Sequence, residues 1–304
     1  MKKIGTYLPS LIISILLVLF MICSVGILIV DININGSQTI TLTEKKDIAA
    51  KTSRQLEHEF KEISGATGIP AEIYTKSLTE DYIQSLINIY INEGYSSLKS
   101  GGKMNIDIPK NKEMEADVEE FFNNMAEQTG YEKNDDFYEK LNNTKQNAYK
   151  LIGEACDVYK FTSLEKHGVL GPVSKVYKIR PLITFVSTGG LALLILALIF
   201  VNRKEKKNVL YWTGISAAIA GAIGMIPSIY LISTKYFNAF SIKQPQIFAA
   251  YTGGMFKLTE AFMAASISVC AAGIAMIVLY VVIGCHRTSS ESKEKLPEIN
   301  KKNI

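Results

Sequence analysis

The chain has 304 residues, of which 48% are hydrophobic and 20% charged, and its mean hydropathy is slightly positive. Soluble domains of this size usually fall below zero, so the composition indicates a membrane protein. Four cysteines in so long a chain exclude a disulfide-stapled scaffold, and three widely separated histidines leave little material for a metal site. We therefore expect neither a metal nor a cofactor.

Four uncharged apolar stretches are each long enough to cross a hydrocarbon core of about 30 Å, which takes about 20 helical residues. None of them contains Lys, Arg, Asp, Glu or His, so each should insert into a bilayer. The sequence therefore predicts an all-α integral membrane protein with spans at residues 8–30, 182–201, 209–232 and 261–284. The first span, with the short stub before it, is expected to be a retained anchor, because no small-x-small cleavage pattern follows it.

The segment 31–180, between the first two spans, is predicted to be a helical domain, because its apolar residues recur with a period near 3.6. Capping-box spacing at Thr41 and Glu44, and again at Ser77 and Glu80, predicts two helix starts. Four such helices can bury a core of their own. Their apolar stripes are Ile48, Thr52, Leu56, Phe60 and Ile63; Ile83, Leu86, Ile87, Tyr90 and Ile91; Met114, Val118, Phe121, Phe122 and Met125; and Phe137, Leu141, Thr144, Ala148, Leu151, Ala155 and Val158.

Two further features of this domain carry expectations. The alternating stretch 104–108 is its only candidate strand, and Gly168, Gly171 and Pro172 predict a turn or a kinked helix before the second span. The domain holds 19 Lys and Arg against 24 Asp and Glu, so it is acidic and gives no reason to expect nucleic acid as a partner.

Small residues recur four apart in the third and fourth spans, a spacing that lets helix backbones approach closely in lipid. The favoured interpretation is packing of the third span on the fourth; a homo-oligomer interface or a substrate path is the alternative. Pro227 lacks a backbone donor and predicts a kink in the third span. The residues predicted to pack are Gly214, Ala218, Gly221 and Gly224 in the third span and Ala264, Ser268 and Ala272 in the fourth.

The segment 233–260 is predicted to be an outer loop whose aromatic residues form a belt at the membrane surface, with a hydrophobic ligand groove as the alternative. The polar, charged tail 286–304 is predicted to be disordered. The six aromatic residues of the loop are Tyr236, Phe237, Phe240, Phe248, Tyr251 and Phe256.

The distribution of Lys and Arg sets the expected orientation. With both termini in the cytoplasm, the inner margin carries eleven basic residues, in the N-terminal stub, the loop 202–208 and the tail. The segment 31–180 is then extracytoplasmic. The Ile, Lys and Asn bias of the chain suits the plasma membrane of a low-GC bacterium.

Several function classes are excluded at this level. The spans have no ionisable group to carry a coupled ion, the chain has no phosphate-binding loop, and the cytoplasmic pieces are too short for an output domain. We therefore expect no enzyme. The favoured function is that of a receptor-like or accessory membrane protein, whose outer domain binds a protein partner or an envelope component.

The alternative is a permease subunit whose ATPase is supplied in trans. The order of one span, a large outer domain and three further spans, with both ends inside, resembles the layout of the MacB and FtsX type of ABC membrane subunit. The chain differs from that type in its short N-terminal stub, in the short loop 202–208, and in an outer domain that reads as all helical.

Overall fold

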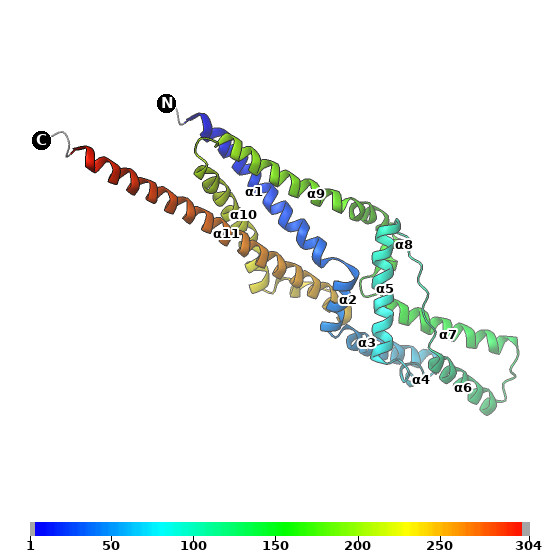
Figure 1. The fold of residues 1–304 in the computed structure, drawn as a ribbon. Helices are drawn as coiled ribbons and strands as arrows, with labels where there is room; N and C mark the ends of the chain where they lie inside the picture. The colour runs from blue at the N-terminus through cyan, green and yellow to red at the C-terminus, as the bar shows by residue number, and fades with distance from the viewer. Residues whose placement is uncertain (1–3, 300–304) are drawn as a thin grey trace. The chain divides into compact units, whose positions relative to one another are not determined.

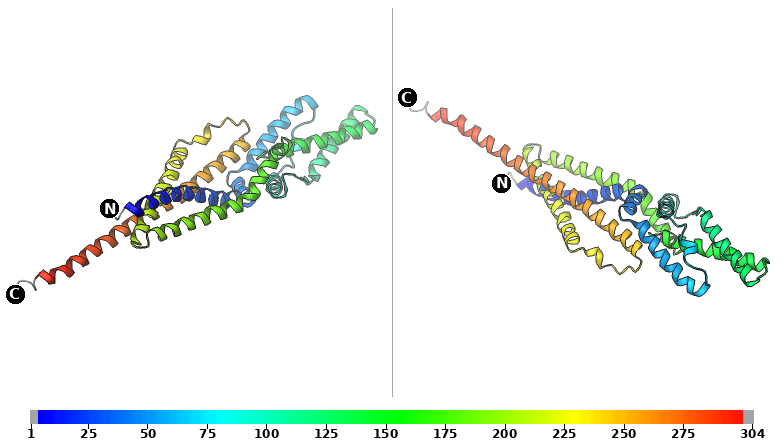
Figure 2. Two further views of the ribbon diagram at one scale, coloured as in Figure 1. Left: turned by 90° about the horizontal axis from the view of Figure 1, so that it is seen from above. Right: turned by 90° about the horizontal axis from the view of Figure 1, so that it is seen from below.

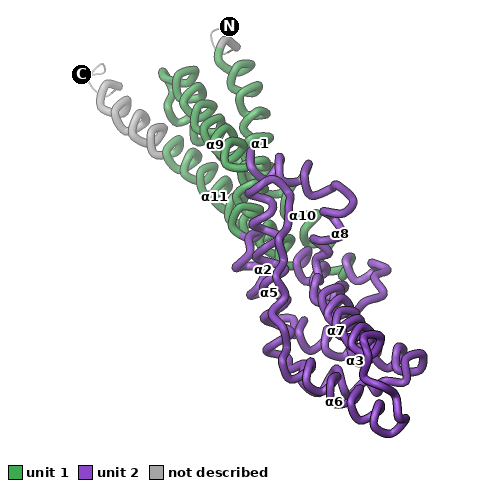
Figure 3. Tube along the Cα trace, turned by 90° about the vertical axis from the view of Figure 1, so that its right-hand side faces the viewer, with its two compact units in different colours: residues 1–32, 180–236, 257–304 green, residues 33–179, 237–256 purple. Residues whose placement is uncertain are grey.

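The structure is a computed structural model that describes the backbone of residues 4–299 and the side chains of residues 6–285. Helices make up 83% of the described residues, which contain no strand. The chain divides into two compact units, shown in Figure 3. Unit 1 comprises residues 1–32, 180–236 and 257–304, and unit 2 comprises residues 33–179 and 237–256.

Four long helices are apolar enough to cross a membrane, which confirms the prediction of an all-α protein with four candidate spans. These helices are α1 (Ile4–Asn33), α9 (Leu170–Val201), α10 (Lys207–Ser233) and α11 (Pro245–Ile299). Both α9 and α11 begin in unit 2 and continue into unit 1 without a break, and Figure 2 shows α11 as one uninterrupted helix.

These helices extend beyond the spans read from hydropathy. The predicted turn before the second span is limited to Gly168, which has a left-handed φ of 70°, and α9 then runs through Pro172 and Pro181. A proline in the first turn of a helix removes a donor that would have no helical partner, so Pro172 suits its position.

The expected outer loop 233–260 is also mostly helical. Only residues 234–244, with the short η1 (Tyr236–Ala239), lie outside a long helix. The backbone of the tail predicted to be disordered continues as α11 to Ile299, because Glu, Lys and Leu are good helix formers. Residues 300–304 of that tail lie outside the described part of the chain.

Unit 2 is a bundle of helices (Figure 1), and its buried residues form one apolar core. Phe60, Ile83, Met114 and Ile152 are among its fully buried side chains. Its helices are α2 (Gly36–Lys45), α3 (Ile48–Thr67), α4 (Glu72–Thr75), α5 (Glu80–Ser100), α6 (Lys112–Thr129), α7 (Asp135–Cys156) and α8 (Phe161–Lys166).

The helix starts of unit 2 differ from the two predicted capping boxes. Thr41 lies inside α2, where its hydroxyl donates to the carbonyl of Ser37 at 3.1 Å. The start of α5 is capped by Thr79, two residues after the predicted Ser77, and Thr79 accepts from the amide of Tyr82 at 3.2 Å. Ser77 and Thr79 are only two residues apart and either hydroxyl could cap a helix, so the spacing in the sequence does not show which one does.

The stretch 104–108 is extended but forms no strand. The amide of Met104 donates to Glu165 at 3.0 Å, and the amide of Asn105 donates to Glu93 at 2.9 Å. Ile106 and Ile108 pack against the apolar core. Carboxylates on neighbouring helices thus take the place of a partner strand in satisfying two backbone donors.

The first turns of α11 belong to the core of unit 2. Ala250 is fully buried, and the Tyr251 hydroxyl donates to the carbonyl of Tyr159 at 2.8 Å. Phe237 packs edge to face against Phe256, with ring centroids 5.1 Å apart. Phe237, Tyr251 and Phe256 were predicted to belong to a membrane-surface belt; Phe237 is buried and the other two are half-buried in contacts within unit 2.

Candidate ligand groove

The predicted small residues of the third span lie at a close contact between α10 and α11. Gly214, Gly221 and Gly224 are all buried. A Cβ added to Gly221 would lie 2.6 Å from the carbonyl oxygen of Ser266, and one added to Gly214 would lie 2.9 Å from that of Gly273. Ala218 is half-buried on the same helix. Only hydrogen at these glycine positions allows the backbones to meet.

The residues of α11 at this contact differ from the predicted ones, which is a correction to the sequence analysis. Ala264, Ser268 and Ala272 are exposed in unit 1, whereas Ser266 and Gly273 are buried against α10. Small residues occur on both stripes of α11, so the four-residue spacing cannot tell which stripe faces a neighbour. Pro227 is exposed, and α10 continues through it to Ser233.

Unit 1 also holds polar contacts that the sequence analysis did not identify. The hydroxyls of Ser14 and Ser216 lie 2.5 Å apart, and those of Ser24 and Ser187 lie 2.6 Å apart. The amide of Asn202 donates to the Ser10 hydroxyl at 2.9 Å. Such short polar side chains join membrane helices without introducing a charge. These contacts pair α1 with α9 and α10, and we assign them to packing.

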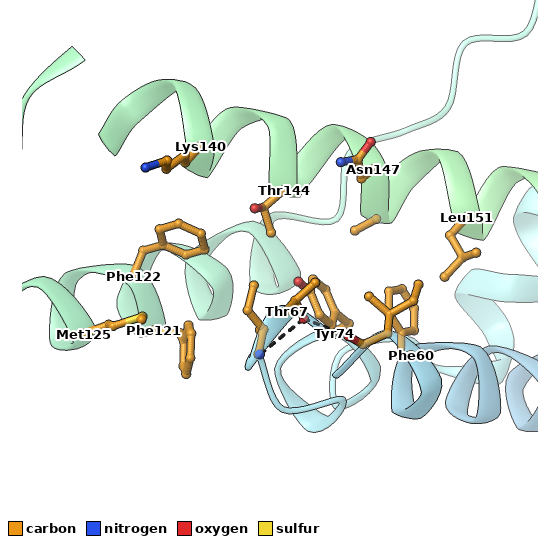
Figure 4. A pocket seen from close by; sticks show the side chains of 13 residues that line it. Phe60, Thr67, Tyr74, Phe121, Phe122, Met125, Lys140, Thr144, Asn147 and Leu151 are labelled. Carbon is orange, nitrogen blue, oxygen red and sulfur yellow. Dashed lines mark hydrogen bonds between the residues drawn. The ribbon is translucent and has the colours of Figure 1, made fainter. Parts of the chain in front are cut away.

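Unit 2 contains an apolar cavity of about 400 Å³ between α3, α6 and α7. In Figure 4, Thr144 and Leu151 of α7 point toward the side chains of α3 and α6 on the other side of the cavity. It is open to solvent along one side. Its lining comprises Phe60, Ile63, Thr67, Ile69, Tyr74, Phe121, Phe122, Met125, Lys140, Thr144, Asn147, Ala148 and Leu151, and we call this surface the groove.

The floor of the groove is aromatic and buried. Phe60 and Tyr74 stack with ring centroids 4.5 Å apart, and both side chains are almost completely buried. Ala148 contributes a small side chain beside them, which leaves the space open. Burial raises the pKa of Tyr74 to about 12, so its hydroxyl stays protonated at neutral pH. That hydroxyl is a polar handle within an otherwise apolar floor.

The walls of the groove are apolar and partly exposed. Met125 is 53% exposed and Ile63 is 38% exposed, while Phe121 and Phe122 are half-buried. Large apolar side chains that stay exposed around a cavity are typical of ligand-binding sites, whereas those of a core are buried. Methionine adapts its shape to different partners because its side chain is unbranched and polarisable.

A second, smaller depression of about 180 Å³ adjoins the first. The two cavities share Phe122, Met125 and Lys140 as lining residues. They therefore lie side by side along α6 and α7, and we call the pair the trough. Tyr131 and Phe137 line its far end. The trough therefore offers two neighbouring apolar recesses separated by a shared wall.

Lys140 is the only charged side chain that lines the groove among the described residues, and it is already paired. Its ammonium donates to Asp136 at 2.7 Å and to the Tyr131 hydroxyl at 3.3 Å. The hydrogen bond to Asp136 is the main reason why the pKa of Lys140 lies above its usual value. Lys140 is thus held at the rim instead of pointing into the cavity as a free cation.

Most of these residues lie on the helix stripes predicted from the sequence, where they were expected to form the core. One feature of the sequence could have indicated a groove. Phe121, Phe122 and Met125 give α6 a wider apolar face than one neighbouring helix covers. No three His, Cys, Asp or Glu side chains converge within the described part of the chain.

Comparisons with known proteins give no relative for this chain: no family model, no curated protein and no solved structure matches it.

Proposed function

We propose that the chain is a multi-pass plasma-membrane protein of the receptor-like or accessory kind, and that unit 2 binds an apolar ligand in the groove. The groove is the observation that carries this proposal, because a monomer rarely leaves aromatic and methionine side chains around an open cavity without a ligand to cover them. No catalytic role is proposed for any residue.

The proposed topology places both termini in the cytoplasm and residues 31–180 on the extracytoplasmic side. This orientation is supported by the excess of Lys and Arg in the N-terminal stub, the loop 202–208 and the tail, which it places in the cytoplasm. The groove would then face the outside of the cell, where a ligand can reach it without crossing the bilayer.

Cysteine labelling in intact cells tests this topology. Met125→Cys places a thiol at a half-exposed position of the groove, and it should react with a membrane-impermeant maleimide before lysis. Lys204→Cys, in the loop 202–208, is the matched control and should react only after lysis. The reverse pattern would refute the orientation.

Ligand binding can be tested with the neutral apolar dye N-phenyl-1-naphthylamine and the full chain in phosphatidylcholine nanodiscs. We expect a saturable rise in fluorescence above that of empty nanodiscs. Ala148→Leu should remove it by filling the floor, and so should Met125→Gln by making the wall polar. Val169→Gln, at an exposed apolar position away from the groove, should leave it unchanged. Absence of a saturable component in the unmodified protein would refute the proposal.

The permease alternative is supported by one observation, the order of one candidate span, a large helical unit and three further candidate spans. Purification in mild detergent separates the two functions. A stoichiometric ATPase that remains bound through size-exclusion chromatography would favour the permease, and a chain that purifies without one would favour the receptor-like protein.

A further inference from the structure

Unit 2 also has an open hollow of a different kind, between α3 and the start of α11. Its volume is about 530 Å³, and the described residues that line it include no Asp or Glu. The lining residues are Lys51, Arg54, Gln55 and His58 of α3 and Pro245 of α11, and we call this surface the basic hollow. Its lining is therefore positively charged, in contrast to the apolar groove.

The three basic side chains of the hollow lie on one face of α3. Lys51, Arg54 and His58 are separated by three and four residues, which brings their side chains next to one another along the helix. Arg54 and His58 are exposed, and Lys51 is half-buried. One ligand in the hollow can therefore contact all three side chains.

The charges of Lys51 and Arg54 are not cancelled by carboxylates. The ammonium of Lys51 donates to the carbonyl of Lys46 at 2.5 Å, and Nε of Arg54 donates to the carbonyl of Ala50 at 3.3 Å. Neither side chain forms an ion pair within the described part of the chain. Because a carbonyl is neutral and both side chains have further N–H donors, both cations remain available to an anion.

Two carboxylates of α3 contact the other lining residues. Glu62 Oε1 lies 3.6 Å from Nδ1 of His58, and Glu59 accepts from the side-chain amide of Gln55 at 2.8 Å. The side chains of His58 and Glu62 are both 69% exposed, so water screens the contact between them. These carboxylates therefore reduce the positive potential of the basic hollow without pairing with its Lys or Arg.

The start of α11 adds unsatisfied polar groups beside Pro245. The Phe248 amide donates to the carbonyl of Gln244 at 2.9 Å. The amides of Gln246 and Ile247 precede this bond and have no acceptor within their own helix, and such free N–H groups favour anions. Gln246 is also fully buried, and neither polar atom of its side chain has a partner in the described part of the chain. Since buried amides are almost always hydrogen-bonded, we expect a polar ligand at the start of α11.

We propose that the basic hollow binds a phosphate group, whose oxygens accept hydrogen bonds from Lys51 and Arg54. The planar guanidinium of Arg54 matches two phosphate oxygens at once, and Lys51 supplies a second positive charge beside it. A phosphate monoester has a further terminal oxygen for His58, whereas a carboxylate has only two oxygens in all. This site is separate from the groove and does not rest on the proposed function.

The size of the basic hollow indicates that the phosphate belongs to a larger molecule. A volume of about 530 Å³ is typical of sites for whole small molecules, and a single phosphate group would fill only part of it. The ligand is therefore a phosphate ester. A phospholipid headgroup and a soluble phosphate ester share this chemistry, and the experiment distinguishes the two sources.

The test uses the full chain in dodecyl maltoside micelles, which contain no phosphate, and glycerol phosphate as the probe. Saturable broadening of its phosphorus NMR line measures binding. Lys51→Gln/Arg54→Gln should weaken binding at least about tenfold, because two charge-assisted hydrogen bonds are lost. Arg54→Lys keeps the charge without the planar fork and should have an intermediate effect.

The matched control removes the same net charge away from the basic hollow. Lys61→Gln/Lys150→Gln changes two exposed lysines that do not line it, and the affinity should change less than about twofold. Equal melting temperatures of the two double variants show that both remain folded.

Phosphatidic acid, which carries a phosphate monoester on a lipid, identifies the source. If the site takes a lipid headgroup, phosphatidic acid added to the micelles should displace glycerol phosphate, and the Lys51→Gln/Arg54→Gln variant should retain less of it in native mass spectrometry. If the site takes a soluble ester, the lipid should leave the line broadening unchanged. Either result supports the phosphate site.

Two outcomes would overturn the inference. The first is that neither glycerol phosphate nor phosphatidic acid binds saturably. The second is that both double variants lose binding equally, since the chain would then respond only to its net charge. Dye binding in the groove would be unaffected by either outcome, so failure of this site is distinguishable from failure of the proposed function.

Discussion

The guanidinium of Arg180 and the carboxylate of Asp31 form an ion pair in unit 1, with Nε 2.5 Å from Oδ1. The Thr184 hydroxyl donates to the other carboxylate oxygen at 2.7 Å. Both charged side chains are about three quarters buried. Because residues 33–179 lie between these two positions in the chain, the ion pair joins α1 and α9 where the polypeptide leaves unit 1 and returns to it.

Removing one partner of this ion pair should destabilise the protein. Asp31→Asn removes the negative charge opposite Arg180 in a partly buried place, and we expect a loss of about 1–2 kcal/mol in the free energy of unfolding. Thermal unfolding in detergent measures the effect. The exposed pair of Asp136 and Lys140 provides the control, since Asp136→Asn should leave the melting temperature unchanged. An equal response of the two variants would contradict a structural role for Arg180 and Asp31.

The packing of α10 on α11 predicts that alanine substitutions at two glycines have different effects on thermal stability. Gly221→Ala should lower the thermal stability of the detergent-solubilised chain by about 1–3 kcal/mol, because the new methyl group would lie 2.6 Å from backbone atoms of α11. Gly189→Ala on α9 meets no atom within 4 Å and should be neutral or slightly stabilising. If both variants behaved alike, the glycine face of α10 would be turned to lipid.

A second pair of glycines tests unit 2. A Cβ at Gly94 in α5 would clash with the ring of Phe161, whereas a Cβ at Gly65 in α3 would meet open space. Gly94→Ala should therefore be destabilising, and Gly65→Ala should stabilise the unit by about 0.5–1 kcal/mol through a lower entropy of the unfolded chain. Chemical denaturation followed by circular dichroism compares the two variants. Destabilisation by Gly65→Ala would argue that α3 does not continue through that position.

The thiol of Cys156 provides a pH-dependent test of the unit 2 core. Burial, with a smaller contribution from Asp157, raises the pKa of Cys156 to about 12. The unfolded thiol titrates near 8.5, so protonation of Cys156 stabilises the fold fully below about pH 8.5, and this stabilisation is lost as the pH rises toward 12. At pH 8 iodoacetamide should not modify Cys156 until denaturant is added, as peptide mass spectrometry can show. Rapid alkylation of the native protein would mean that this part of the core is open.

The sequence by itself determined that the protein is helical and has four segments apolar enough to cross a membrane. Four uncharged apolar runs are typical of membrane spans, and the 3.6-residue stripes of α3, α5, α6 and α7 favour helices over strands. These properties depend on composition and on spacing along the chain, so they can be read without knowing which segments meet.

Only the tertiary structure decided what each apolar face meets. It turned Ser266 and Gly273 of α11 toward α10 instead of Ala264 and Ser268, and it placed Ala250 in the core of unit 2. It also left Met125 beside an open groove, although the sequence gives this residue the same stripe as Val118, which is fully buried. Periodicity fixes the direction of a side chain around its own helix, whereas burial depends on how closely a second helix approaches, and that distance is set by residues far away in the chain.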